Sequence, residues 1–167
     1  GDTFRPAFEA LLDEIVTYPT PVIAAINGTA LGAGMQLAVA CDLRVVSDNA
    51  VFGIPAARLG VVISAANTQR LMRVVGSAAT RDILLTARTL NIDEAERCGL
   101  VQRRASNALE AATALAIEVS ALAPLSVRSN KYAIGIIESN NQLDPKAIAV
   151  LKERETEAFS SEDLREG

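Results

Sequence analysis

Hydrophobic positions in the first half of the chain alternate between helical spacing and short continuous runs. Five apolar residues between positions 8 and 16 recur at helical spacing, which predicts an amphipathic helix that Pro19 and Pro21 end. The continuous apolar run 21–26 is typical of a strand buried on both faces. In chain order, the elements predicted here are a helix over 8–16, a strand over 21–26, a helix over 33–40, and strands over 43–46 and 51–52.

The second half of the chain carries mainly helical patterns. The predicted helices cover residues 68–75, 78–85, 93–98, 108–122, 125–137 and 145–159. Gly76 separates the first two, and Gly99 lies where a left-handed residue would end the third. Leu100-Val101 is predicted as a last edge strand. Strands that alternate with helices, followed by helices alone, indicate an α/β layer capped by a helical segment.

Composition excludes several kinds of site. The 167 residues contain no histidine, which excludes Ser-His-Asp and Cys-His catalysis and histidine-ligated metal sites within them. The net charge of −4 and the absence of tryptophan argue against nucleic acid as a partner. We interpret Cys41 and Cys98 as small buried apolar residues. No metal is expected.

The long uncharged stretch between Glu14 and Asp42 raises the question of a transmembrane helix. Prolines and glycines inside it divide the stretch into a strand, a turn and a short helix, so no membrane span is expected. The first residues lack the basic start and apolar run of a signal peptide, which favours a cytoplasmic protein.

A glycine-rich segment, residues 27–34, joins the strand over 21–26 to the helix over 33–40. Glycines let the backbone approach a ligand closely, and the free N–H groups that open a helix form an anion or oxyanion site. The segment fits neither the Walker A motif nor the dinucleotide-binding fingerprint. Its spacing alone leaves open a second interpretation, in which the glycines only permit tight packing of strand and helix.

The motifs of the chain, taken together and in order, resemble those of the crotonase (enoyl-CoA hydratase/isomerase) family over almost the whole sequence. They are Pro21–Gly34, Leu37–Arg44, Phe52-Gly53 with Pro55, Leu59-Gly60, Thr68–Leu71, Val75-Gly76, Glu94-Ala95 with Gly99–Val101, Ala123-Pro124 with Lys131, and Ser161–Asp163 with Glu166-Gly167.

This resemblance implies a fold, an assembly and a ligand. The fold is α/β, with a crotonase-like β-β-α spiral core of which residues 1–105 form part. Residues 106–167 would be a C-terminal helical segment for oligomerisation and closure of the acyl-CoA pocket. The expected protein is a homo-trimer or a dimer of trimers that binds fatty acyl-CoA thioesters, with coenzyme A as part of the ligand and no separate cofactor. In family terms the chain is expected to be truncated at both ends, so that the upstream loop that gives the first oxyanion-hole N–H would precede it.

The resemblance also assigns binding residues. The second oxyanion-hole N–H, which polarises the thioester carbonyl, falls on Ala33. Lys131 and Lys152 could contact the phosphates of coenzyme A or be solvent-exposed. The substrate-binding positions carried over from the family are Ala30, Leu31, Gly32, Gly34, Phe52, Pro55, Leu59 and Lys131.

The catalytic acids of the family are missing from this sequence. Family hydratases use two glutamates, and the matching positions hold Gln36 and Ala56. A glutamine can hold a water but cannot accept its proton, and alanine has no polar group. Ser64 matches a loop position where some family branches use an aspartate, although a serine there also suits a helix N-cap. Catalysis would need an acid from upstream or from the acyl-CoA itself. The sequence therefore favours binding and polarising a thioester over hydrating one, with a non-catalytic acyl-CoA-binding or delivery protein as the alternative.

Overall fold

The computed structural model describes residues 3–139 and 145–160. The α-helices are α1 (Phe4–Thr17), α2 (Ala33–Ala40), α3 (Ala65–Thr86), α4 (Ile92–Arg97), α5 (Ala108–Ser120), α6 (Pro124–Ser139) and α7 (Pro145–Ser160), with a 3-10 helix η1 (Pro55–Leu59). The strands are β1 (Ile23–Ile26), β2 (Ala30–Leu31), β3 (Leu43–Val46), β4 (Phe52–Gly53), β5 (Thr89–Leu90) and β6 (Arg103–Arg104). The last predicted family motif, residues 161–167, lies outside the described residues.

The strands form two three-stranded sheets through a repeated strand–strand–helix unit. β1 is followed by β2 and α2, and β3 is followed by β4 and α3. The first strands of these units pair in parallel, with Ile23 opposite Leu43, and β6 extends this sheet beside β3. The second strands, β2 and β4, also pair in parallel, and β5 joins β4 antiparallel. This arrangement is the predicted β-β-α spiral.

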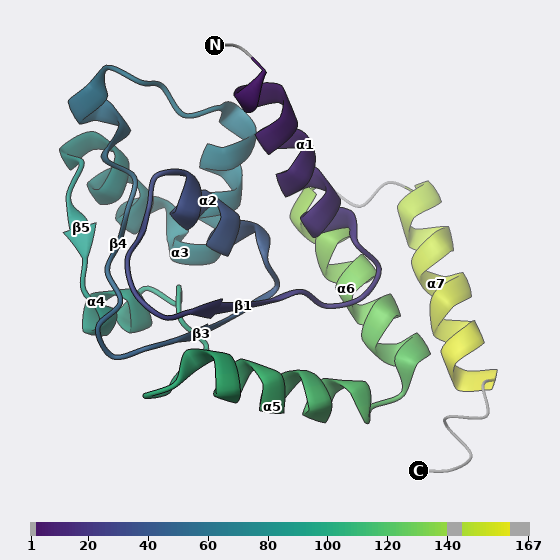
Figure 1. Cartoon of the computed structure of the whole chain (residues 1–167). Helices are drawn as coiled ribbons and strands as arrows, with labels where there is room; N and C mark the ends of the chain where they lie inside the picture. Colours follow the sequence, from purple (N-terminus) through teal and green to yellow (C-terminus); the bar gives the residue numbers. More distant parts are fainter. Residues whose placement is uncertain (1–2, 140–144, 161–167) are drawn as a thin grey trace.

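Two hydrophobic cores hold the layers together. In the larger core, Met35 of α2, Phe52 of β4, and Leu71 and Ile83 of α3 are almost completely buried. The smaller core lies where α5 covers the sheet of β1 and β3, and Val45 is its fully buried strand residue. Figure 1 shows α5 running along this sheet on the face opposite α2. By its packing, α5 belongs with the core that the sequence places in residues 1–105.

The last two helices are attached more loosely. α6 runs beside α1, and α7 packs on α6 (Figure 1). No residue of α6 is fully buried, and its Ile134 and Ile137 are more than half exposed.

In the part of the chain that the structure describes, no single helix is long and apolar enough to span a membrane. α5 and α6 meet the length and composition test only as a pair, and their axes are bent by 110° from each other.

Most of the predicted elements are confirmed. The helix over 33–40 and the strand over 43–46 have the predicted bounds, and Gly76, with a φ of 78°, breaks α3 where expected. Two predictions were wrong. β1 is not buried on both faces, because it is the edge strand of its sheet. Leu100-Val101 is not a strand: both residues are buried ahead of β6, which begins at Arg103.

Candidate functional site

The start of α2 is built around a glycine that no other residue could replace without strain. Gly32 has a φ of 55° and a ψ of −115°, a conformation that disfavours side chains, and its N–H donates to the Gly53 carbonyl at 2.8 Å. Ala33 follows as the first residue of α2 and is exposed. Within residues 3–139 and 145–160 the Ala33 N–H has no hydrogen-bond acceptor. It is therefore available to an atom of a ligand at the positive end of the helix dipole.

The predicted substrate-binding residues around this N–H divide into two groups. Ala30 and Phe52 face each other across β2 and β4 and are buried in the larger core, so they hold the strand under the site. The others lie wholly or partly at the surface. They are Leu31, Gly32, Gly34, Pro55 and Leu59, the last with 77% of its area exposed. This second group is the one that a ligand can reach.

The two positions that the sequence matches to the family's acids, Ala56 and Gln36, differ in their surroundings. Ala56 of η1 is partly buried against the larger core and presents only a methyl group. Gln36 lies one turn after Ala33 on α2, partly buried, and its Oε1 accepts a hydrogen bond from Nδ2 of Asn67 at 2.6 Å. Neither side chain can take a proton from water.

Ser64 serves as the N-cap of α3. Its Oγ accepts from the Asn67 N–H at 3.3 Å, which confirms the capping interpretation of this residue. The same hydroxyl donates to Oε1 of Glu9 at 2.9 Å. Ser64 thus links the start of α3 to α1 as well as capping its own helix.

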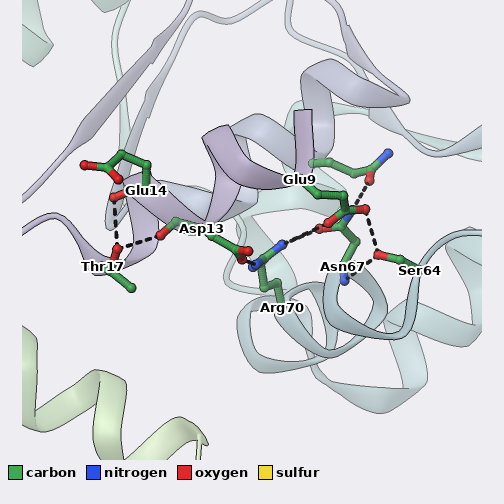
Figure 2. Close-up of polar contacts among 8 residues, drawn as sticks. Glu9, Asp13, Glu14, Thr17, Ser64, Asn67 and Arg70 are labelled. Atoms are coloured by element: carbon green, nitrogen blue, oxygen red, sulfur yellow. Dashed lines mark hydrogen bonds and ion pairs between the residues drawn. The ribbon is translucent and has the colours of Figure 1, made fainter. Parts of the chain in front are cut away.

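Glu9 brings a carboxylate from α1 into this region. Its Oε1 also accepts from Nδ2 of Asn67 at 2.9 Å, and its Oε2 lies 3.9 Å from Nη1 of Arg70. Arg70 in turn donates to Oδ1 of Asn67 and pairs with Asp13 of α1 (Figure 2). Glu9, Asp13, Ser64, Asn67 and Arg70 therefore form one polar network between α1 and α3, and it reaches Gln36 on α2.

Sequence reasoning missed Glu9. In the sequence it is one polar residue on an amphipathic helix, and its partners Ser64 and Asn67 lie 55 and 58 residues away along the chain. Only the packing of α1 against α3 brings them together. No local pattern in the sequence carries that information.

Lys131 is held inside the protein rather than extended toward solvent. Its Nζ lies 2.6 Å from Oδ2 of Asp42 and 3.2 Å from the carbonyl oxygen of Thr20, and its side chain is only 10% exposed. Asp42 also accepts from the Val22 N–H at 2.7 Å. Lys131 therefore links α6 to the core. Its ammonium group is paired with the Asp42 carboxylate, so it is not free to bind a phosphate of coenzyme A.

A buried cation, Arg44 of β3, lies against the C-terminal end of α2. Arg44 donates to the carbonyl oxygens of Ala38, Cys41 and Leu100 at 3.2, 2.7 and 2.5 Å, and burial lowers the pKa of its guanidinium. Burial also raises the pKa of the Cys41 thiol, which keeps it protonated and suits the predicted role of a small apolar residue. A cavity of about 550 Å³ opens here between α2, α3 and α6, and Ala33 and Gln36 do not line it.

Comparison with known proteins identifies the family. The family model described as Enoyl-CoA hydratase/isomerase matches residues 1–167. The chain belongs to the enoyl-CoA hydratase/isomerase family. Among curated proteins it is 39% identical to the short-chain-enoyl-CoA hydratase of Clostridium acetobutylicum, over 87% of this chain and 56% of that protein. It is also 39% identical to the human mitochondrial enoyl-CoA hydratase domain-containing protein 2, over 78% of this chain and 47% of that protein.

Solved structures share the fold of this chain. An enoyl-CoA hydratase subunit I of Geobacillus kaustophilus superimposes with a TM-score of 0.86 at 35% identity, over 98% of this chain and 63% of that one. DspI of Pseudomonas aeruginosa gives a TM-score of 0.87 at 29% identity, over 100% of this chain and 66% of that one. The chain thus spans about half to two thirds of the length of these similar proteins.

Proposed function

We propose that this family member binds fatty acyl-CoA thioesters at the start of α2 and polarises the thioester carbonyl through the Ala33 N–H. The observation that carries the proposal is the unpartnered N–H at the first residue of an eight-residue helix, behind a glycine with a φ of 55°. A carbonyl oxygen that accepts this N–H lies at the positive end of the α2 dipole, where developing negative charge is stabilised. A second donor is expected from the upstream loop.

The chemistry around Ala33 favours binding over hydration. Adding water across an α,β-double bond requires one group that takes a proton from water and one that delivers a proton to carbon. Gln36 and Ala56 occupy the two positions where the family's acids are expected, and neither can perform either step. We therefore propose a protein of lipid metabolism that holds or delivers acyl-CoA without hydrating it.

Glu9 supports a second candidate, an active enoyl-CoA hydratase or isomerase with a relocated acid. Its carboxylate shares the Asn67 amide with Gln36 and is partly accessible, with 29% of its side chain exposed. This carboxylate already accepts two hydrogen bonds and lies beside Arg70. It would have to exchange some of these contacts for a proton from water, in a hydratase, or from the substrate, in an isomerase, which makes catalysis the less favoured candidate.

One pair of measurements separates the two candidates. The protein is mixed with a short enoyl-CoA, and loss of the conjugated chromophore is followed alongside thermal stabilisation by a saturated acyl-CoA. Stabilisation without turnover is expected for the binding protein. Turnover that Glu9→Gln abolishes would instead establish the relocated acid.

The proposed hydrogen bond from the Ala33 N–H to the thioester carbonyl can be tested by a proline substitution. Proline at the first position of a helix removes the N–H and is otherwise well tolerated there. Ala33→Pro is expected to weaken acyl-CoA affinity about tenfold, the effect of one lost hydrogen bond to a polarised carbonyl. The matched control is Ala65→Pro, at the first position of α3 and also exposed, which should bind as the parent does. Equal affinity of Ala33→Pro and the parent, measured by titration calorimetry, would overturn the assignment of the carbonyl to this N–H.

The expected assembly, a homo-trimer or a dimer of trimers in the cytoplasm, is part of the same proposal. Exposed apolar residues of the last helices, Ile134 and Ile137 of α6 and Ile148 of α7, are suited to contact with a neighbouring subunit. Sedimentation velocity tests this: a monomer at micromolar concentration would contradict the assembly and leave acyl-CoA binding a separate question.

A further inference from the structure

We propose that Gln36 presents its amide nitrogen to the bound acyl group, so that the site prefers an acyl thioester with a second acceptor oxygen near the thioester, of which a 3-oxoacyl-CoA is the simplest example. This inference rests on the proposed binding of acyl-CoA at Ala33. In this proposal Gln36 offers a hydrogen-bond donor at the position where the family's proton acceptor is expected.

The orientation of Asn67 is determined from both of its ends. Arg70 has only donors, and it donates to one end of the Asn67 amide, which must therefore be the oxygen Oδ1. The carboxylate of Glu9 has only acceptors, and it lies 2.9 Å from the other end, which must therefore be the nitrogen Nδ2. A reversed amide would place like groups against each other at both contacts.

The orientation of Gln36 follows from that of Asn67. Nδ2 of Asn67 lies 2.6 Å from the Gln36 amide, and only the oxygen of that amide can accept its hydrogen. The Gln36 oxygen is thus used inside the protein, and its nitrogen, Nε2, is the group that remains. Among the described residues Nε2 has no acceptor.

The position of Gln36 on α2 brings Nε2 toward the site. Residues three apart lie on one face of a helix, and helical side chains lean toward the N-terminus, so the Gln36 side chain extends over the turn that begins with Ala33. Gln36 is partly buried rather than enclosed. The Ala33 N–H and the Gln36 amide therefore form a pair of donors along one face.

These two donors, the Ala33 N–H and the Gln36 amide, favour a ligand that has an acceptor oxygen for each of them. A saturated acyl chain that covers Gln36 would remove water from Nε2 without replacing it, which leaves a buried donor unpaired. An acyl group with an oxygen at the third carbon would accept from Nε2 while its thioester carbonyl accepts from Ala33. A site that offers a hydrogen bond discriminates against the analogue that cannot make it.

Titration calorimetry with two ligands of equal chain length tests the inference. The parent protein is expected to bind the 3-oxoacyl-CoA about tenfold more tightly than the saturated acyl-CoA. Gln36→Met keeps the length and the unbranched shape of the side chain but has no donor, and it should bind both ligands equally. The matched control is Gln69→Met, at an exposed glutamine of α3, which should keep the parent's preference.

Each outcome decides between the proposals. Equal binding of both ligands by the parent, or a preference that survives in Gln36→Met, would overturn the role of Gln36 while acyl-CoA binding stands. Binding of neither ligand would overturn the proposed function itself. If Gln36→Met fails to fold, Gln36→Glu gives the same test, because its second oxygen offers an acceptor where Gln36 offers a donor.

Discussion

Asn67 is the residue on which the polar network between α1, α2 and α3 depends. It is 4% exposed, and its side-chain amide contacts Arg70 through oxygen and Glu9 and Gln36 through nitrogen. A buried amide with every contact satisfied adds modest stability, whereas removal of one partner leaves the others unpaired inside the protein. The chemical identity of each end of Asn67 is therefore as important as its size.

An isosteric substitution exposes this dependence. Asn67→Asp keeps the shape of the side chain but places a charged oxygen against the oxygens of Glu9 and Gln36. The free energy of unfolding at neutral pH is expected to fall by about 2–3 kcal/mol, because two donated bonds become contacts between acceptors. Urea titration measures it. The control, Asn130→Asp at an exposed residue of α6, should change stability little, and an equally small change in Asn67→Asp would contradict the network.

At the scale of single elements, α4 is stabilised by reciprocal contacts at its first turn. The Asn91 side chain accepts from the Glu94 N–H, and the Glu94 carboxylate accepts from the Asn91 N–H, both at 2.9 Å. Glu94 also pairs with Arg88 at 2.8 Å. First the hydrogen bond from the Asn91 backbone and then the Arg88 guanidinium hold the pKa of Glu94 below its usual value of 4.5. The charged form of Glu94 is therefore the one that stabilises the folded protein.

The lowered pKa gives this capping interaction a pH dependence. The contribution of Glu94 is present above its unfolded pKa of 4.5 and is lost as the pH falls through the lower folded value. Glu94→Gln should lower the melting temperature at pH 7, and this difference should shrink at about pH 3, as the pH falls below 4.5 toward the lowered pKa of the folded state. Glu155→Gln, at an exposed glutamate of α7, serves as the control and should differ little from the parent at either pH. A difference for Glu94→Gln that persists unchanged at low pH would count against the charge as its cause.

How well each element could be predicted depends on its length. α2 and β3 have the predicted bounds because glycines precede the run of helix formers over 33–40, and polar residues 47–49 follow the mainly apolar run over 43–46. β2 and β5 have two residues each, which is too short for any periodicity, and the sequence predicted neither. The edge position of β1 is a property of the assembled sheet and leaves no mark in its own four residues.

In the candidate site, too, local motifs predicted some residues, and only the packing of the folded chain reveals others. The family motifs locate Ala33, Gln36 and Ala56 directly, because their positions are set by neighbours in the sequence. Glu9 enters the site only through contacts between helices far apart in the chain, and the inward position of Lys131 likewise depends on its salt bridge with Asp42, 89 residues away. Motifs therefore predicted which groups are missing, but only the packing shows which groups surround them.

At the scale of the whole molecule, a polar contact made by Lys131 joins α6 to the core. Few apolar side chains anchor this helix, since none of its residues is fully buried. Lys131 compensates by bonding the Asp42 carboxylate and the carbonyl oxygens of Thr20 and Ile15. One ammonium group thus joins α6 to the end of α1, the loop before β1 and the start of β3.

Loss of that ammonium group should loosen α6 specifically. Lys131→Met is expected to increase amide hydrogen exchange throughout α6 by about tenfold while leaving α2 and α3 protected, because a mostly buried ion pair is worth more than an exposed one. Hydrogen exchange followed by mass spectrometry resolves the helices. The control is Lys152→Met, at an exposed lysine of α7. Unchanged protection of α6 in Lys131→Met would show that apolar packing alone holds it.

The donor at Ala33 belongs to the main chain, and this has an evolutionary consequence. A backbone N–H is present whatever side chain the codon specifies, provided that Gly32 keeps its positive φ and lets α2 begin at this place. A catalytic acid, in contrast, is lost by one substitution. Under the proposed function, one substitution can therefore remove proton transfer while the backbone donor that would hold the thioester stays in place.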